Sequence, residues 1–193
     1  MAKTSKTIGI VAFQGGVIEH KKIVQELGHR VIEVREPKDL SSCEAFIIPG
    51  GESTTIGFFI EQTGIGKELI KRAAAGTPII GTCAGAIVLA KNINSNIIPP
   101  HLGLLDITIR RNAYGQQIDS FYADLQIPSL KINNLHAAFI RAPIIEKTGT
   151  EVKILARHGK EIVLVQQGKI LAATFHAELR ADPRLHEYFI SLI

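Results

Sequence analysis

The sequence contains no tryptophan, only two cysteines, and no hydrophobic run long enough to form a membrane-spanning helix. Two cysteines in 193 residues cannot build the disulfide framework of a small secreted protein. The first apolar segment is too short for the core of a signal peptide. We therefore expect a protein of the cytoplasm that does not act at a membrane.

A long run of charge of one sign is also missing. The net charge is +4 and the isoelectric point about 9.1, but the basic residues are scattered, in pairs such as Lys21-Lys22 and Arg110-Arg111. This distribution is typical of a solvated surface, and we expect no nucleic-acid partner. The cysteines and histidines do not have the spacing of metal ligands, so we expect neither a metal nor another cofactor.

Hydrophobic residues (46%) and charged residues (21%) occur in the proportions of a globular protein. With no repeat and no linker-like stretch, we expect one domain over residues 1–193. The first half alternates between apolar strands and helices, which predicts a parallel sheet covered on both faces. We expect strands at residues 8–13, 31–34, 45–48 and 79–82, and helices at 17–27, 55–62, 65–75 and 84–91.

The second half is richer in strands. We expect them at residues 105–109, 138–141, 152–156, 161–166 and 170–175, followed by a closing helix at 183–192. The predicted fold class is α/β: a three-layer sandwich with a mostly parallel central sheet and added antiparallel strands.

The sharpest local pattern is Gly-Thr-Cys-Ala-Gly at residues 81–85, between an apolar strand and an apolar helix. Glycines two residues before and after Cys83 allow the tight strand-to-helix turn of a nucleophile elbow. A thiol at the start of a helix is favoured as thiolate. The alternative is a buried cysteine that acts as a small apolar residue, which is our interpretation of Cys43.

A thiolate nucleophile needs a base, and the base needs an orienting group. His176 and Glu178 supply both types, and residues two apart in extended backbone project to the same side. An isolated His-x-Glu is a weak signal, because such residues more often lie on the surface without a catalytic role, but the elbow strengthens it. Four other histidines are interpreted as surface or helix-face residues: His20, His29, His158 and His186.

A third segment, Pro-Gly-Gly-Glu-Ser-Thr at residues 49–54, follows the strand at 45–48. Adjacent glycines allow successive N–H groups to converge on an anion, as an oxyanion hole requires. The peptide between Gly50 and Gly51 can also rotate, which would present either an N–H or a carbonyl to the site. An ordinary turn is the alternative. A phosphate loop is excluded, because no Lys-Ser/Thr pair follows.

Together these segments resemble the class I, or triad, glutamine amidotransferase family. Within it, the chain is similar to the glutaminase subunits of pyridoxal 5′-phosphate synthases. The resemblance covers nearly the whole chain and is carried by residues 13–15 (FQG), 49–55 (PGGESTT), 81–85 (GTCAG), 102–106 (LGLLD), 111–115 (RNAYG), 119–121 (DSF) and 139–143 (FIRAP).

The resemblance implies hydrolysis of L-glutamine to glutamate and ammonia. It implies delivery of the ammonia to a separate (β/α)8-barrel synthase subunit in a hetero-oligomer, which makes the vitamin B6 coenzyme. The implied roles are Cys83 as nucleophile, His176 as base and Glu178 as its orienting partner. The remaining implied residues are Gly51 and Ala84 as oxyanion donors, Gly51, Glu52, Ser53, Arg111, Ile140 and Arg141 as glutamine-binding residues, and Gln14 and Gly15 as partner contacts.

The chain departs from the family at Ala177, where a proline is usual, and residues 127–138 match poorly. Arg111 and Arg141 have an alternative interpretation as solvated or ion-paired surface residues. Three alternative functions remain open at this stage. They are a triad glutaminase of another pathway such as histidine biosynthesis, a non-catalytic assembly partner of the same fold, and a related cysteine hydrolase or chaperone.

Overall fold

The computed structural model describes residues 4–111 and 120–193. Residues 112–115 and Asp119, which carry part of the resemblance, lie outside this range, as do residues 1–3. The described strands are β1 (Thr7–Val11), β2 (Arg30–Val34), β3 (Ala45–Ile48), β4 (Ile79–Thr82), β5 (Ala90–Asn94), β6 (Leu105–Arg110), β7 (Phe121–Ile127), β8 (Ile132–Phe139), β9 (Ile144–Thr148), β10 (Lys153–His158), β11 (Glu161–Gln167) and β12 (Ile170–Ala173). The helices are α1 (Val17–Glu26), α2 (Ser53–Gln62), α3 (Ile65–Ala74), α4 (Ala84–Leu89) and α5 (Arg184–Ile190), with short 3-10 helices η1 (Pro37–Leu40), η2 (Pro128–Leu130) and η3 (Glu178–Arg180).

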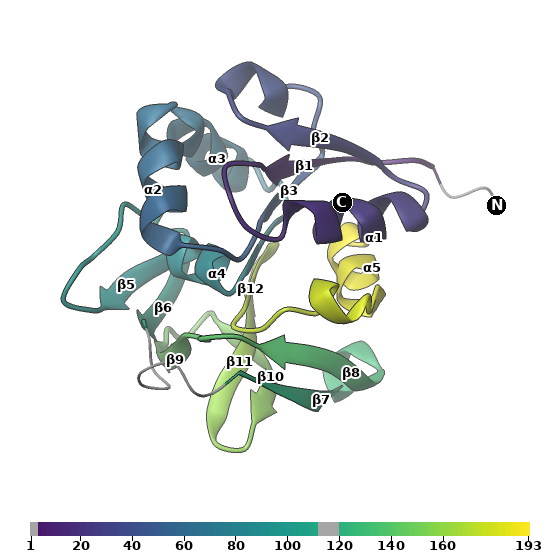
Figure 1. The fold of residues 1–193 in the computed structure, drawn as a ribbon, viewed down its shortest axis with the longest axis vertical. Helices are drawn as coiled ribbons and strands as arrows, with labels where there is room; N and C mark the ends of the chain where they lie inside the picture. Colours follow the sequence, from purple (N-terminus) through teal and green to yellow (C-terminus); the bar gives the residue numbers. More distant parts are fainter. Residues whose placement is uncertain (1–3, 112–119) are drawn as a thin grey trace.

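One large sheet runs through the molecule in the order β2-β1-β3-β4-β12-β11-β9-β6-β5, with β10 paired to β11 (Figure 1). The strands from β2 to β12 are parallel, whereas β11 is antiparallel to both β12 and β9. Strands β7 and β8 form a separate antiparallel pair beside α5. The predicted fold, a mostly parallel sheet with added antiparallel strands, is confirmed.

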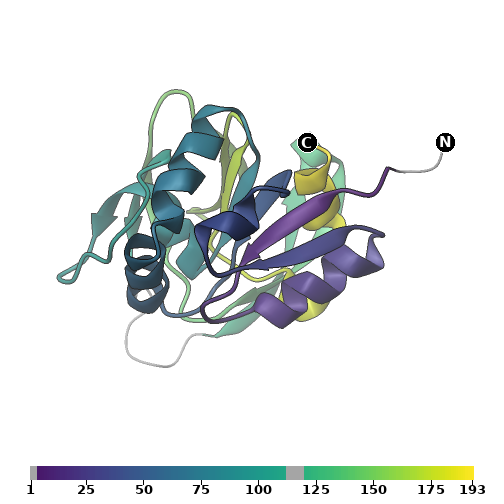
Figure 2. The ribbon, with the colours of Figure 1, turned by 90° about the horizontal axis from the view of Figure 1, so that it is seen from above.

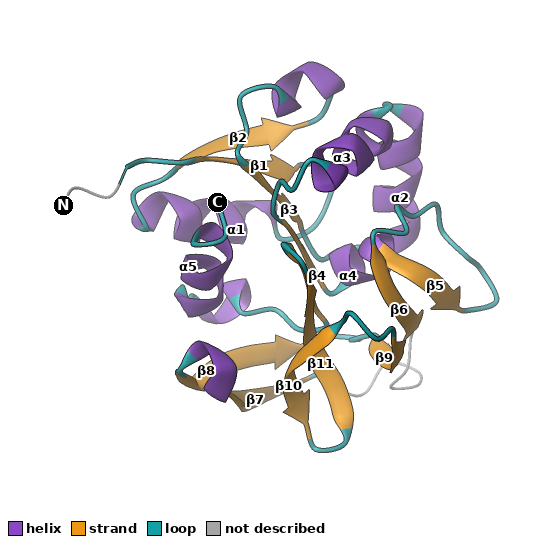
Figure 3. Cartoon of the chain, turned by 180° about the vertical axis from the view of Figure 1, so that it is seen from behind, coloured by secondary structure: helices purple, strands orange, loops and turns teal. Residues whose placement is uncertain are grey.

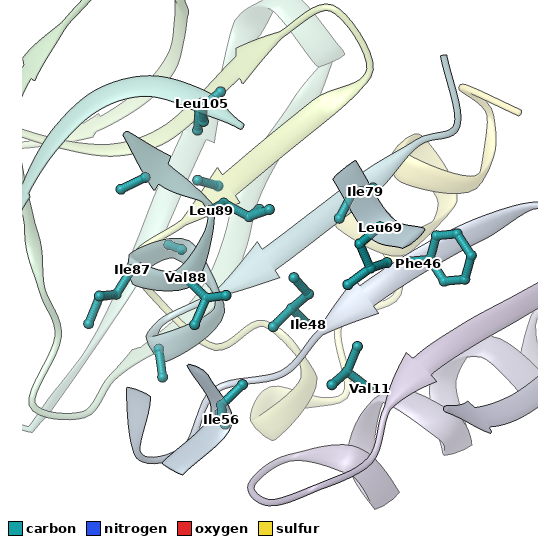
Figure 4. Packing of buried hydrophobic residues seen from close by; sticks show 14 of the residues in the cluster. Val11, Phe46, Ile48, Ile56, Leu69, Ile79, Ile87, Val88, Leu89 and Leu105 are labelled. Carbon is teal, nitrogen blue, oxygen red and sulfur yellow. The ribbon is translucent and has the colours of Figure 1, made fainter. Parts of the chain in front are cut away.

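Helices cover both faces of the parallel strands. Helices α2, α3 and α4 lie on one face, and α1 and α5 lie on the other (Figures 1 and 2). Two hydrophobic clusters correspond to these faces, one with Ile48, Ile56 and Val88 (Figure 4) and one with Ile47 and Phe189. Because successive strand residues point to opposite faces, a strand buried on both sides must be apolar throughout. This requirement explains the continuous apolar runs from which the strands were predicted.

Several predicted boundaries are wrong. Strand β1 ends at Val11 rather than at residue 13, and β12 ends at Ala173 rather than at residue 175. The helix predicted to reach residue 91 ends at Leu89, because the chain then enters β5, which pairs with β6. The strand predicted at 138–141 is the end of β8 and stops at Phe139. Strands β5, β7 and β9 were not predicted; β5 and β6 are seen beside α2 and α4 in Figure 3.

The parallel strands bring four loops to one edge of the sheet. The carboxyl ends of β1, β3, β4 and β12 lie next to one another, because these strands are parallel neighbours. The residues that follow these ends include Gln14, Gly50, Cys83 and His176. In open α/β sheets, this edge is where ligands bind.

Candidate active site

A cavity of ≈ 550 Å³ opens at the carboxyl edge of the parallel strands. Every residue predicted for the site except Glu178 lines it, and Glu178 lies buried behind His176. The predicted residues on the cavity wall are Gln14, Gly15, Gly51, Glu52, Ser53, Cys83, Ala84, Arg111, Ile140, Arg141 and His176. Segments far apart in the sequence are thus brought to one place, while the roles of the residues remain predictions.

Cys83 occupies a strained turn between β4 and α4. Its φ of 48° and ψ of −104° are unusual for a residue with a side chain. The flanking glycines are sterically required. A Cβ at Gly81 would lie 2.4 Å from the Gly85 backbone, and a Cβ at Gly85 would lie 1.9 Å from the Ile48 carbonyl oxygen. The backbone here has the form expected of a nucleophile elbow.

His176 and Glu178 are in contact, but not for the reason that the sequence suggested. Nδ1 of His176 lies 2.6 Å from Oε1 of Glu178. The backbone between them is not extended, because Ala177 has helical angles (φ −78°, ψ −32°) and Glu178 begins η3. His176 instead forms a bridge with Ala138 of β8, and the turn into η3 then carries the carboxylate back to the imidazole.

The charges at the site support one another. Burial opposes a charge on His176, but hydrogen bonds to Cys83 and Glu178 and the Glu178 carboxylate raise its pKa to about 10. Burial also opposes a charge on Glu178, but His20 and His176 lower its pKa to about 2. Both shifts favour the charged forms, an imidazolium at His176 and a carboxylate at Glu178.

The Gly50-Gly51 loop is tied to two neighbouring segments. The N–H of Gly50 donates to Thr82 Oγ1 at 3.1 Å, and the Gly50 carbonyl accepts the N–H of Gly16 at 3.1 Å. The imidazole of His176 lies against Gly50, where a Cβ would be 2.2 Å from His176 Cε1. Gly51, with a φ of +158°, lines the cavity.

The predicted glutamine-binding residues all line the cavity. The Glu52 carboxylate caps α2 by accepting from Thr54, and it also accepts a hydrogen bond from Arg111 Nη2 at 3.2 Å. Arg111 therefore holds Glu52. Ser53 is buried, whereas Ile140 and Arg141 are exposed. The carbonyl of Ile140 lies 3.8 Å from Cys83 Sγ.

The interpretation of the other histidines as surface or helix-face residues is wrong for His29 and incomplete for His20 and His186. His20 and His186 do lie on helices, but on their buried faces, and His29 is also buried. Nε2 of His20 lies 3.4 Å from Glu178 Oε1, so His20 belongs to the surroundings of the site. The sequence held a signal for it, because His20 shares the apolar helical face of Val17, Val24 and Leu27.

Within residues 4–111 and 120–193, none of the helices is long and apolar enough to span a bilayer. The same part of the chain shows no group of three or more His, Cys, Asp or Glu residues placed to hold a metal ion.

Comparison with known proteins matches residues 10–193 to the SNO glutamine amidotransferase family. The chain is 46% identical to the pyridoxal 5′-phosphate synthase subunit PdxT of Pelotomaculum thermopropionicum, over 95% of this chain and 93% of the relative. It is 49% identical to the subunit of the same name in Herpetosiphon aurantiacus, over 96% of this chain and all of the relative. A crystal structure described as a glutamine amidotransferase superposes with a TM-score of 0.91 at 47% identity, covering 96% of this chain and 97% of the other.

Proposed function

The chain belongs to the SNO glutamine amidotransferase family, and on that premise we propose that it is the glutaminase subunit of a pyridoxal 5′-phosphate synthase. It hydrolyses the side-chain amide of L-glutamine and supplies the ammonia to a synthase subunit for vitamin B6 biosynthesis. The observation that carries this proposal is the position of the His176 ring, which lies 2.6 Å from the buried Glu178 carboxylate and lines the same cavity as Cys83.

The first half of the reaction forms a thioester. The Cys83 thiolate attacks the amide carbon of glutamine, and the carbonyl oxygen becomes an oxyanion. The N–H groups of Gly51 and Ala84 stabilise that oxyanion; the latter is available because the first N–H groups of a helix lack intrahelical partners. Imidazolium His176 donates its proton to the departing nitrogen, the C–N bond breaks, and ammonia leaves.

The second half releases glutamate. His176, now neutral, takes a proton from water, and the resulting hydroxide attacks the thioester carbon. The C–S bond breaks, glutamate leaves, and the Cys83 thiolate and the imidazolium are restored. Glu178 holds the ring in one tautomer and stabilises its positive charge in both halves.

The cavity wall provides the groups that a free amino acid requires. Arg111 and Arg141 are cations that attract the α-carboxylate of glutamine, and Glu52 is an anion that attracts its α-ammonium group. Arg111 also fixes Glu52 through their hydrogen bond. Ser53 and Ile140 complete the walls near Cys83.

The proposed partner is a (β/α)8-barrel synthase subunit in a hetero-oligomer. Gln14 and Gly15 lie at the rim of the cavity, where a partner can contact them and receive ammonia. Exposed apolar side chains near this edge, Phe58, Phe59 and Leu179, fit a protein–protein contact.

The decisive experiment measures glutamate release from glutamine, with and without the cognate synthase subunit. We expect glutamate release that depends on Cys83 and increases with the synthase. No release in the presence of the synthase would reject the proposed function and favour a non-catalytic assembly role.

A further inference from the structure

His20 connects three elements behind the candidate active site. Its side chain, on α1, is completely buried. Nε2 of its ring lies 3.1 Å from Thr82 Oγ1 and 3.4 Å from Glu178 Oε1. Nδ1 lies 2.8 Å from Nε2 of His186 on α5. A buried chain of polar groups thus runs from α5 through α1 to the carboxylate that orients His176.

The hydrogen positions in this series of polar groups can be assigned by starting from His186. A neutral imidazole has one N–H donor and one acceptor nitrogen. If His20 Nδ1–H donated to His186 Nε2, the His186 proton would be on Nδ1, which has no hydrogen-bond partner among the described residues. A buried N–H without an acceptor is rarer and more costly than an unpaired acceptor. His186 Nε2–H therefore donates to His20 Nδ1.

The environment of the other nitrogen leads to the same assignment. With Nδ1 as an acceptor, His20 carries its proton on Nε2, which faces Glu178 Oε1 and Thr82 Oγ1. The opposite tautomer would place a lone pair of Nε2 beside an anionic carboxylate, which is repulsive. Both rings are neutral, since burial lowers the pKa of His20 and lowers that of His186 to about 3.

The Nε2–H of His20 is also connected, through Thr82, to the Gly50-Gly51 loop. Thr82 Oγ1, which lies next to His20 Nε2, also accepts the N–H of Gly50 at 3.1 Å. Gly50 precedes the proposed oxyanion donor Gly51 and lies against the His176 ring. One buried group thus contacts both the carboxylate of the triad and the hydroxyl that holds the loop.

We propose that His20 is a positioning residue of the glutaminase, a neutral imidazole whose Nε2–H holds Glu178 and Thr82 in place and whose tautomer is set by His186. This inference rests on the proposed function. His20 acts through Glu178 and does not line the cavity among the described residues. Its loss lets the carboxylate and the loop relax, and the ordered geometry that catalysis requires is then less populated.

The first test compares two substitutions. His20→Leu fills much of the space but removes the donor, whereas His20→Gln can place an amide N–H close to the position of Nε2. With saturating synthase, we expect His20→Leu to lower kcat by about 10–100-fold, as is typical when a partner that orients an active residue is removed. We expect KM for glutamine to change by less than about twofold, and His20→Gln to recover part of kcat. His29→Leu, which removes a buried histidine that does not line the cavity, is the matched control and should keep kcat.

The second test does not depend on activity. Nitrogen NMR of the protein labelled with ¹⁵N-histidine reports which ring nitrogen carries the proton, and the His20→Gln and His29→Leu variants assign the signals. We expect neutral His20 and His186 rings, both protonated on Nε2. A proton on Nδ1 of His20, or a folded His20→Leu variant with the kcat of the wild type, overturns the proposal. If the wild type releases no glutamate, the proposed function fails, while the NMR result still decides the tautomer.

Discussion

The N–H of Gly16 donates a hydrogen bond to the carbonyl of Gly50 at 3.1 Å. Because no cis peptide occurs in the described chain, the N–H of Gly51 points away from Gly16, opposite to that carbonyl. The turn after β1 thus hydrogen-bonds one of the two orientations of the peptide that carries the proposed oxyanion donor. The turn comes close to this peptide, since a Cβ at Gly15 would lie 1.6 Å from the Gly50 oxygen.

The first prediction follows from this close approach. Gly15→Ala must displace the Gly50 carbonyl, so kcat for glutamate release should fall by about 10²–10³, the effect of losing one oxyanion donor. Gly28→Ala is the control, because Gly28 has a similar φ (84° against 89°) but no atom within 4 Å of the new Cβ. Both variants bear the strain of alanine at positive φ, roughly 1–2 kcal/mol. Equal kcat values in the two variants would contradict the prediction.

The second prediction separates the two cysteines. Cys83→Ala should lower glutamate release by about 10⁴-fold or more while retaining thermal stability and synthase binding, because it deletes only the nucleophile. Cys43 is buried, its thiol donates to the Asp39 carbonyl, and burial raises its pKa to about 11. Cys43→Ala should therefore keep kcat and lower stability by about 1 kcal/mol. Residual activity of a few per cent in Cys83→Ala would exclude Cys83 as the nucleophile.

The third prediction concerns pH. The protonated form of His176 donates its proton to the amide nitrogen that leaves as ammonia, so the rate should fall as pH rises through the His176 pKa of about 10. In Glu178→Gln, a neutral amide no longer stabilises the imidazolium. The pKa of His176 then drops and the alkaline limb moves to lower pH. The pH–rate profiles of the two proteins, recorded at saturating glutamine, are the measurement, and an unshifted limb would count against this pairing.

The roles proposed for His176 and Glu178 also predict which substitution lowers kcat more. Glu178→Gln should lower kcat by about one to two orders of magnitude less than His176→Ala, because an orienting group contributes less than the base itself. Equal losses would mean that Glu178 does more than orient the ring.

The sequence was most informative where burial alone determines structure. β3 and β4 were predicted with correct bounds, because strands covered on both faces must be apolar at every position. The end of α4 was missed because the apolar pattern continues through Ala90, and only the pairing of β5 with β6 decides that the helix stops. Such a choice depends on a strand that lies more than ten residues away in the sequence.

In the candidate site, too, the features set by local sequence were predicted and those set by tertiary packing were not. The elbow at Cys83 was predictable because its glycines are local requirements for a tight turn. The surroundings of Glu178 were not predicted, because His20 and His186 come from helices at opposite ends of the chain and approach only through tertiary packing. Their positions on apolar helical faces indicated burial, but a helical face does not identify the group that a buried histidine contacts.

A further prediction tests the departure at Ala177. Its φ of −78° lies within the range of proline, and its N–H donates no hydrogen bond within the described part of the chain. His176 before it is held in a strand-like bridge, the conformation that a following proline favours. Ala177→Pro should keep kcat and stabilise the fold by about 0.4–1 kcal/mol, measured by thermal unfolding. Marked destabilisation would indicate that the proline ring does not fit at this buried position.

The last prediction concerns the synthase subunit. A glutaminase that works at full speed alone would release ammonia that no acceptor uses, so we expect weak activity alone and strong stimulation by the synthase. The structure offers a means, because a partner that contacts Gln14 and Gly15 also stabilises the bond from Gly16 to Gly50. If the Gly50-Gly51 peptide were rotated, its carbonyl would face the oxyanion and repel it. The loss of one oxyanion donor changes the rate by about 10²–10³. Stimulation by the synthase should be of similar size.

Gly51→Ala tests this means directly. The φ of Gly51, +158°, is rarely adopted by other residues, and an added Cβ would lie 3.2 Å from the Cα of Gly15. The variant should bind the synthase yet show little stimulation, because alanine disfavours the orientation that the partner stabilises. The measurement is steady-state glutamate release against synthase concentration, with binding followed separately. If the wild type is already fully active alone, the curve will be flat and rotation of the Gly50-Gly51 peptide is not the means of control. In that case the active orientation of the peptide is populated without the synthase, and the synthase has no equilibrium to shift.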